Sequence, residues 1–266
     1  MIDAMRAAGI NYTGEIIADG KIHRFHVPGH SPGTKNGSYI HYPDEPPAGW
    51  FCDFKSGISQ SWSASGEPPS QERIEKSKQA ADDERKKMQA KAARKASTYW
   101  HGSAHAVDHP YLAAKKIKPF GAREFAGALV IPLYNADKAL VNLQFINADG
   151  TKRFLSGGRK KGCFFPIGEP TDKLLICEGF ATGASLRDHT GHCVIVAFDA
   201  GNLKPVALEI NSLFKGPEII ICADNDESGV GQKAAEDAAL AVYGSVLMPP
   251  NVGEDWNDYF TKGNND

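Results

Sequence analysis

Residues 219–239, IIICADNDESGVGQKAAEDAA, form an apolar run that ends in two aspartates and leads into a helix-like segment. One residue separates Asp224 from Asp226, so in an extended backbone both side chains point to the same side. Two carboxylates about 5 Å apart repel by roughly 3 kcal/mol at an effective dielectric near 20. The pair therefore predicts a compensating partner, which is a metal ion, a shared proton or a nearby base.

Strand-like and helix-like segments alternate from residue 173 onward. Strands are expected at 173–179, 193–199, 218–226 and 245–250, with helices at 180–190, 202–214 and 230–244 between them. Near-continuous apolar strands separated by such helices are typical of a parallel sheet built from right-handed βαβ units. We therefore expect an α/β domain at residues 172–266, with a Rossmann-like parallel sheet and flanking helices.

Acidic residues stand at the carboxyl ends of three expected strands: Glu178, Asp199, and Asp224 with Asp226. Ligands of open parallel sheets bind beyond the carboxyl ends of the strands, so these acids would share one edge. Hard cations such as Mg²⁺ prefer carboxylate and water oxygens, and two such ions can clamp the reacting oxygens of a phosphoryl transfer. The alternative is helix capping, in which an aspartate accepts backbone N–H groups. For four acids at one edge, we favour a metal site.

Composition divides the rest of the chain into three segments. Residues 1–63 contain short alternating runs between Gly/Pro turns and predict a small antiparallel β unit. Residues 64–98 are expected to form a charged helical linker after a hinge at 64–70. We interpret this linker as a solvated spacer, with nucleic-acid binding by its basic second half as the alternative. Residues 99–171 predict an α+β subdomain, with a short helix at 109–117 and a meander at 127–135, 139–147 and 151–158.

Basic residues are concentrated in TKRFLSGGRKKG, residues 151–162. Strand alternation places Lys152 and Arg153 on opposite faces, so one of them is expected to point into a groove. Arg159, Lys160 and Lys161 follow two glycines, which permit close approach of backbone to phosphate. The cluster directly precedes the acidic sheet, and we therefore favour contact with phosphates over a solvated loop.

Net charge, cysteines, histidines and apolar runs limit the expected partners, compartment and cofactors of the chain. The net charge of -2 gives no whole-chain argument for nucleic acid. None of the five cysteines forms a CxxC pair, and three lie in apolar runs, which favours a reducing cytoplasm. Scattered histidines with one cysteine make zinc an improbable cofactor; they are His23, His26, His30, His41 and Cys52. No stretch approaches the roughly 18 apolar residues of a membrane span, so we expect no membrane partner. Trp50, Phe51 and Phe54 are expected in the core.

Four segments together resemble the Toprim domain of primases and topoisomerases: residues 174–186, 194–203, 219–239 and 254–260. The resemblance implies that Glu178, Asp224 and Asp226 are catalytic and bind metal, with Asp255 as a further metal ligand. It also implies nucleotide or template contacts for Asp199, Asn202 and Asp258.

Upstream segments are similar to other parts of primases. Residues 127–168 resemble the basic subdomain that precedes Toprim in phage and plasmid primases, where a Lys-Arg-Phe strand and a glycine pair line the catalytic groove. This implies that Lys152, Arg153 and Phe154, followed by Gly157 and Gly158, line the groove. With the phosphate contacts expected of the basic cluster, nucleotide or template binding is predicted for Lys152, Arg153, Arg159, Lys160 and Lys161. Residues 20–30 and 49–57 resemble the N-terminal β unit of primases from conjugative plasmids and mobile elements, which implies template recognition by residues 1–63.

The family likeness implies a DNA primase that makes short RNA primers on single-stranded DNA from ribonucleoside triphosphates, by two-metal nucleotidyl transfer with Mg²⁺ or Mn²⁺. The alternatives are a Toprim metal-dependent nuclease and a non-catalytic replication-initiation DNA-binding module. A topoisomerase is disfavoured because no further domain is present to carry a tyrosine. Related primases often continue into a helicase, so we expect either a stand-alone subunit or a fragment, with a replicative helicase fused or acting in trans.

Overall fold

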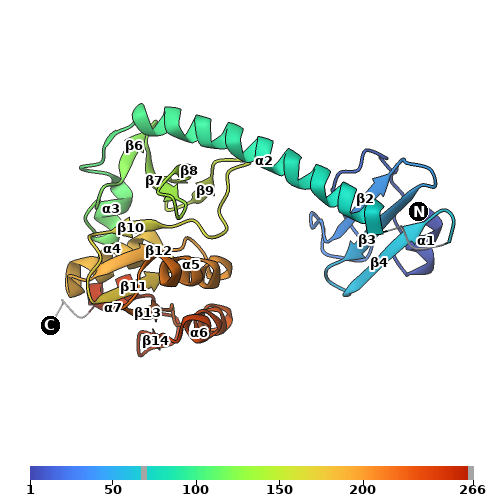
Figure 1. Ribbon diagram of the computed structural model, residues 1–266. Coiled ribbons are helices and arrows are strands. Elements are labelled where there is room, and N and C mark those ends of the chain that lie inside the picture. Colours follow the sequence, from blue (N-terminus) through green and yellow to red (C-terminus); the bar gives the residue numbers. More distant parts are fainter. Residues whose placement is uncertain (67–70, 263–266) are drawn as a thin grey trace. The chain divides into compact units, whose positions relative to one another are not determined.

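The computed structural model describes residues 1–66 and 71–262, and its contacts divide the chain into two compact units (Figure 1). The first unit is Met1–Arg85 and the second is Lys86–Asp266. Helix α2 (Gln71–His101) crosses this division. Part of the predicted hinge, residues 67–70, lies outside the described residues. The domain boundaries at 63/64, 98/99 and 171/172 stay predictions.

The first unit is an antiparallel sheet, as the alternating runs predicted. Its strands are β1 (His23–Phe25), β2 (Gly37–Tyr42), β3 (Ala48–Asp53) and β4 (Ile58–Ser63), paired in that order. Helix α1 (Ile2–Ala7) contributes Met5 to a core with Phe25, Tyr39 and Phe51. Phe51 is fully buried as expected, but the prediction for Phe54 is wrong. Phe54 is 58% exposed, and the guanidinium of Arg24 lies 4.7 Å from the centre of its ring.

The histidines of the first unit have separate partners. His23 Nε2 lies 2.8 Å from Asp19 Oδ1, and His26 Nδ1 lies 2.9 Å from the Thr34 carbonyl oxygen. His30 Nε2 lies 3.3 Å from the buried Asp53 carboxylate. Within residues 1–66 and 71–262, no three His, Cys, Asp or Glu side chains are placed to hold one metal ion.

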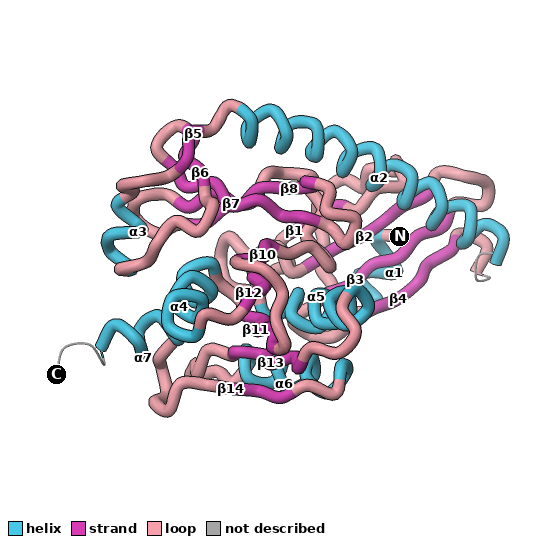
Figure 2. The backbone as a smooth tube through the Cα atoms, turned by 60° about the vertical axis from the view of Figure 1, so that its left-hand side comes forward, coloured by secondary structure: helices cyan, strands magenta, loops and turns pink. Residues whose placement is uncertain are grey.

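The second unit begins with an antiparallel sheet. Its strands are β5 (Ala104–His105), β6 (Arg123–Phe125), β7 (Ala128–Tyr134), β8 (Leu140–Ile146) and β9 (Lys152–Phe154), in that order, and α3 (Pro110–Lys115) lies between β5 and β6 in the chain. Alternate residues of β7 face opposite sides: Val130 packs with Ala96 of α2, whereas Ile131 joins the core shared with the second sheet. Figure 2 shows α2 along β7 and β8. The packing of Ala92 and Ala96 differs from the wholly solvated spacer that the sequence predicted.

The second sheet is mixed. Its strands β10 (Phe165–Ile167), β12 (Cys193–Val196), β11 (Lys173–Cys177), β13 (Glu218–Cys222) and β14 (Ser245–Leu247) lie in that spatial order. All adjacent pairs are parallel except β10 with β12. The expected parallel α/β sheet is therefore confirmed with one correction, an antiparallel edge strand supplied by residues upstream of 172. Strands β12 and β13 also end three to four residues earlier than predicted, so the acids lie in the loops that follow.

Helices cover both faces of the mixed sheet. Ile176 and Ile221 pack against α5 (Ala200–Leu213) and α6 (Val230–Val242) in one core. The alternate residues Cys177 and Cys222 join the other core, which includes α4 (Phe180–Thr190) and aromatic rings of α7 (Trp256–Lys262). That core also contains Leu129, Ile131 and Leu133 of β7, so the two sheets of this unit pack around common apolar side chains. None of the helices in the described part of the chain has the length and apolar character to cross a bilayer.

Candidate active site

The register of the mixed sheet brings the predicted acids to one edge. Cys177 of β11 pairs with Cys222 of β13 and with Val196 of β12, so the three strands end at the same level. Glu178 follows β11 directly, and the loops after β12 and β13 carry Asp199 and Asp224. The convergence depends on parallel strand pairing, which the apolar runs between residues 173 and 222 encode.

Glu178 and Asp226 approach each other beside Gly231, in the first turn of α6. A Cβ atom on Gly231 would lie 2.8 Å from Asp226 Oδ2 and 3.1 Å from Glu178 Oε1. The two oxygens can therefore be no farther apart than the sum of these distances. Asp226 accepts hydrogen bonds from the Ser228 hydroxyl at 2.5 Å and from the Gly231 N–H at 3.2 Å. The capping interpretation thus holds in part for Asp226, whose pKa these bonds lower.

Asp224 has no such local partners. Its Oδ1 atom is buried without a hydrogen-bond partner among the described residues. Burial, followed by the charge of Asp255, raises the pKa of Asp224 to about 6, and Lys152 opposes this shift. Asn225 faces away as expected, since its Nδ2 donates to the Pro249 carbonyl oxygen at 3.0 Å. An orphaned carboxylate oxygen at a strand end indicates a ligand site, because buried polar atoms normally have partners.

Glu178 is a second site carboxylate with a raised pKa. Burial, followed by the charges of Asp224 and Asp199, raises its pKa to about 7, and the Ala200 backbone N–H at the start of α5 partly opposes this. Two neighbouring carboxylates with raised pKa values are a pattern of functional sites, since a purely structural cluster would pair with bases instead.

Lys152 points toward the carboxylates. A Cβ atom on Gly179, the residue after Glu178, would lie 4.0 Å from its Nζ. Loss of hydration near the protein is the largest effect on the Lys152 ammonium group and lowers its pKa, as does the charge of Lys115. The charges of Asp224 and Asp255 oppose this and raise the pKa. Arg153 lies on the opposite face of β9, with its guanidinium 4.8 Å from the centre of the Phe145 ring. Of this pair, Lys152 is therefore the residue that faces the acids.

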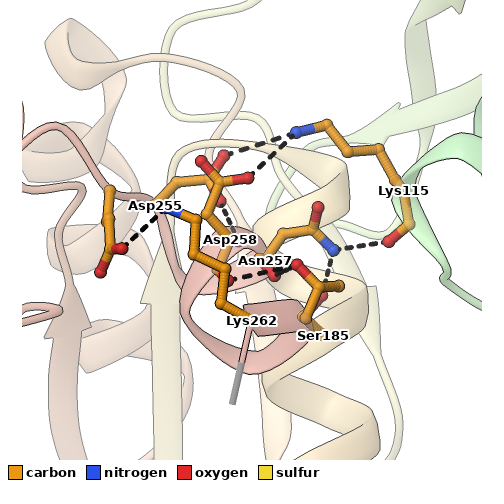
Figure 3. A network of polar contacts seen from close by, with 8 residues as sticks. Lys115, Ser185, Asp255, Asn257, Asp258 and Lys262 are labelled. Atoms are coloured by element: carbon orange, nitrogen blue, oxygen red, sulfur yellow. Dashed lines mark hydrogen bonds and ion pairs between the residues drawn. The ribbon is translucent and has the colours of Figure 1, made fainter. Parts of the chain in front are cut away.

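Lys115, at the end of α3, is a site residue that sequence analysis missed. Its Nζ lies 3.8 Å from Asp255 Oδ2 and 3.9 Å from Asp258 Oδ1 (Figure 3). The predicted helix at 109–117 was correct, but nothing in its sequence indicated that its last turn meets the loop before α7. The proximity is a tertiary contact between residues more than a hundred positions apart.

Asn257, in α7, holds the end of α3 in place, and sequence analysis did not identify this role either. It is buried, and its Nδ2 donates to the Lys115 carbonyl oxygen at 2.7 Å and to Ser185 Oγ at 2.8 Å (Figure 3). Asp255 Oδ1 accepts the Asp258 N–H at 2.7 Å, which is the geometry of a helix N-cap. The DWND motif therefore ties α7 to α3 and α4 while it holds Asp255 beside Asp224.

Asn202 does not have the geometry of a direct nucleotide contact. It is 2% exposed, and all its hydrogen bonds are to backbone. Its Oδ1 accepts the Gly162 N–H at 2.8 Å, and its Nδ2 lies 2.8 to 3.2 Å from the carbonyl oxygens of Ala197, Cys163 and Lys160. The nucleotide contact predicted for Asn202 is corrected to an anchor for the loop at 159–163.

This anchored loop carries the remaining basic residues. Lys160 forms an ion pair with Asp199, and its Nζ lies 5.3 Å from the centre of the Phe154 ring. Arg159 Nε donates to the Lys161 carbonyl oxygen at 3.0 Å, and the Lys161 side chain is exposed. Asp199 is the N-cap residue of α5 but makes no capping hydrogen bond through its side chain, so its carboxylate remains for Lys160.

Substitution Asn202→Ala is expected to lower the free energy of unfolding by about 2 kcal/mol or more, because it leaves the buried Gly162 N–H and its neighbouring carbonyl groups without partners. Urea unfolding of the variant and the parent measures this loss. The control is Asn211→Ala on the same helix, which should change stability far less. Equal effects of the two substitutions would contradict the anchoring role.

The residues at the sheet edge fit a divalent cation. The fit depends on the orphaned Asp224 Oδ1, the space that Gly231 leaves between two carboxylates, and the raised pKa values of Glu178 and Asp224. Mg²⁺ is usually held by one or two carboxylates with water and substrate phosphates completing its octahedral shell. A preformed cage of three acids is not required for such a site.

Comparison with known proteins gives a domain family for residues 173–266 and two curated relatives for most of the chain. Residues 173–266 match the Toprim domain family, so strands β11–β14 with helices α4–α7 lie in a Toprim domain, and the edge strand β10 precedes it. Over 93% of its length the chain is 33% identical to a DNA primase TraC of Escherichia coli, and it covers 19% of that protein. A second Escherichia coli DNA primase TraC is 32% identical over 88% of the chain, with 24% of that protein covered. The resemblance to Toprim-type primases is thereby confirmed.

The chain spans less than a quarter of the length of these curated relatives. Among solved structures, it is similar to the primase fragment of the bacteriophage T7 primase-helicase protein. The sequence identity is 19%, the match covers 61% of this chain and 75% of that chain, and the TM-score is 0.47.

Proposed function

We propose that this chain is the catalytic part of a DNA primase, which joins ribonucleoside triphosphates into a short RNA primer on a single-stranded DNA template. The observation that carries the proposal is the meeting of Glu178, Asp224 and Asp226 at one edge of the Toprim sheet, with one buried carboxylate oxygen unpartnered. The DNA primase relatives support the same reaction.

Glu178, Asp224 and Asp226 would hold Mg²⁺ or Mn²⁺, with Asp255 as a further ligand. When bound, divalent ions lower the pKa of the primer 3′-hydroxyl and neutralise charge on the leaving pyrophosphate. Asp226 is kept in place and ionised by Ser228 and the Gly231 N–H. Glu178 and Asp224 have raised pKa values and would give up their protons as the ions bind.

Basic residues at the same edge would bind phosphates. Lys152 is directed at the carboxylates, and Lys160 is held at the edge by Asp199. Arg159 and Lys161 belong to the same anchored loop and would contact the template or the incoming triphosphate. Lys115 would act as a positioning residue, since its ammonium group lies between Asp255 and Asp258 and helps to keep Asp255 beside Asp224.

We further propose that a replicative helicase, fused or in trans, is a partner, and that template recognition involves residues 1–63. A cytoplasmic location is supported by the five cysteines, which are all free and buried.

The test is incubation of the chain with single-stranded DNA of defined sequence, labelled ribonucleoside triphosphates and Mg²⁺ or Mn²⁺. Primase activity requires labelled oligoribonucleotides whose formation depends on template, triphosphates and metal together. Shortening of the DNA without triphosphates would assign a nuclease instead. Binding of DNA with neither product would assign a non-catalytic module.

A further inference from the structure

The second half of α2 belongs to the same compact unit as strands β5–β9. Ala92 and Ala96 are 5% and 0% exposed, and Ala96 packs with Val130 and Phe145. A Cβ atom on Gly157 would lie 3.8 Å from the Met88 carbonyl oxygen, so the loop after β9 also contacts this half of the helix. The buried side of the helix is thus fixed, and the opposite side is presented to solvent.

The solvent side of this half is strongly basic. Its cations are Lys86, Lys87, Lys91, Arg94 and Lys95, all exposed. No acidic residue occurs between residues 86 and 107, and none of these cations takes part in an ion pair within the described chain. Lys87, Lys91 and Lys95 have i,i+4 spacing, at which like charges destabilise a helix by roughly 0.2–0.5 kcal/mol per pair. Such a stripe is expected where an external anion supplies the missing counter-charge.

Arg153 extends the stripe from α2 onto the sheet. Its guanidinium lies 4.8 Å from the centre of the Phe145 ring, and Phe145 meets Tyr99 edge-on with ring centres 6.0 Å apart. Lys95 Nζ in turn lies 5.4 Å from the centre of the Tyr99 ring. These consecutive contacts place the two cations on one surface. We name Lys87, Lys91, Lys95, Tyr99 and Arg153 the α2 basic face.

The α2 basic face is separate from the carboxylate edge. Arg153 and Lys152 are neighbours on β9 whose side chains leave opposite faces of the sheet, and Lys152 is the one directed at the acids. The sequence predicted that Lys152 and Arg153 lie on opposite faces, and Arg153 is the one on this second surface; its predicted nucleotide or template contact stays a prediction.

We infer that the α2 basic face binds the sugar–phosphate backbone of single-stranded nucleic acid, as a second contact distinct from the catalytic edge. The inference rests on the proposed primase function for its choice of partner. Lys87 to Lys95 spans about 12 Å at ~1.5 Å per helical residue, so these three cations form a continuous track that can follow the backbone of one nucleic-acid strand. Cationic side chains that follow the strand backbone are the usual composition of a single-strand surface, and Tyr99 adds one partly exposed ring to this face.

The test compares two variants of the full chain that lose the same charge. The first carries Lys87→Gln, Lys91→Gln and Lys95→Gln. The matched control carries Lys21→Gln, Lys215→Gln and Lys233→Gln, exposed lysines elsewhere on the chain. Fluorescence anisotropy with a labelled oligothymidylate of about 20 nucleotides, in EDTA and at several salt concentrations, gives Kd and its salt dependence. Circular dichroism melting confirms that each variant is folded.

The first variant should bind at least about tenfold more weakly, and its slope of log Kd against log salt should fall by about 2, since each phosphate contact with a single strand contributes ~0.7. The control should change neither quantity appreciably. Equal Kd and slope in the two variants would overturn the inference, as would competition by polyglutamate of equal charge at the same concentration as the oligonucleotide. Because binding is measured without metal, unchanged DNA affinity of the first variant, together with primer synthesis by the parent chain, refutes only this inference. DNA binding by the α2 basic face without any primer synthesis by the parent chain refutes only the proposed function.

Discussion

Asp224→Asn is expected to reduce primer synthesis at least about 100-fold while making the metal-free protein more stable at pH 7.5. The activity falls because the amide replaces an anionic ligand at the position where charge develops in the transition state. Stability rises because the pKa of Asp224 is about 6 in the folded chain, above the usual value of 3.8, so that folding disfavours the ionised form. The destabilisation in the parent is absent when this carboxyl is protonated and develops as pH rises from about 3.8 through about 6.

Primer synthesis and thermal melting of the same preparation measure both effects. The control is Glu227→Gln, an exposed acid in the same loop, which should leave both unchanged. Mg²⁺ should raise the melting temperature of the parent and of the control but not that of Asp224→Asn, since only a site that binds metal stabilises the folded state by mass action. A fully active Asp224→Asn enzyme would refute the assignment of the edge as the catalytic site.

The sequence alone predicted the fold of the Toprim domain because the signals for that fold are local. Apolar strands, helices of regular length and acids placed just after the strands imply a common edge once the strands pair in parallel, and the register of Cys177 with Cys222 bears this out. The antiparallel edge strand β10 was missed because residues 165–167 are too short to show a period and lie before the alternating pattern begins.

The sequence failed to predict the roles of some site residues because those roles depend on tertiary contacts. Lys115 and Asn257 act through a contact between α3 and α7, and no spacing in either helix encodes that contact. A nucleotide or template contact was expected for Asn202 from the family resemblance, whereas its buried amide is directed to backbone groups of another loop. The buried face of α2 was overlooked because Ala92 and Ala96 contribute little to a hydrophobic pattern, although their small size lets the helix approach the sheet.

Affinity for Mg²⁺ is expected to fall steeply as pH is lowered, because Glu178 and Asp224 must be deprotonated to bind a cation. Their pKa values are about 7 and about 6, so both carboxylates are ionised at pH 8 and both are protonated near pH 5. Each bound proton that must be displaced reduces the apparent affinity about tenfold per pH unit below that pKa. The affinity should therefore drop about tenfold from pH 7 to pH 6 and more steeply below pH 6.

Calorimetric Mg²⁺ titrations at pH 6, 7 and 8, in buffers with different ionisation enthalpies, give both the affinity and the number of protons released. Release should approach zero at pH 8 and exceed one at pH 6. Glu178→Gln should release one proton fewer near pH 6, and this difference assigns the higher pKa to Glu178 independently of catalysis. Primer synthesis at pH 6.5 should recover when Mg²⁺ is raised, because protonation competes with the cation and leaves the fold unchanged. An affinity that does not vary between pH 6 and 8 would show that the raised pKa values belong to carboxylates that do not bind the metal.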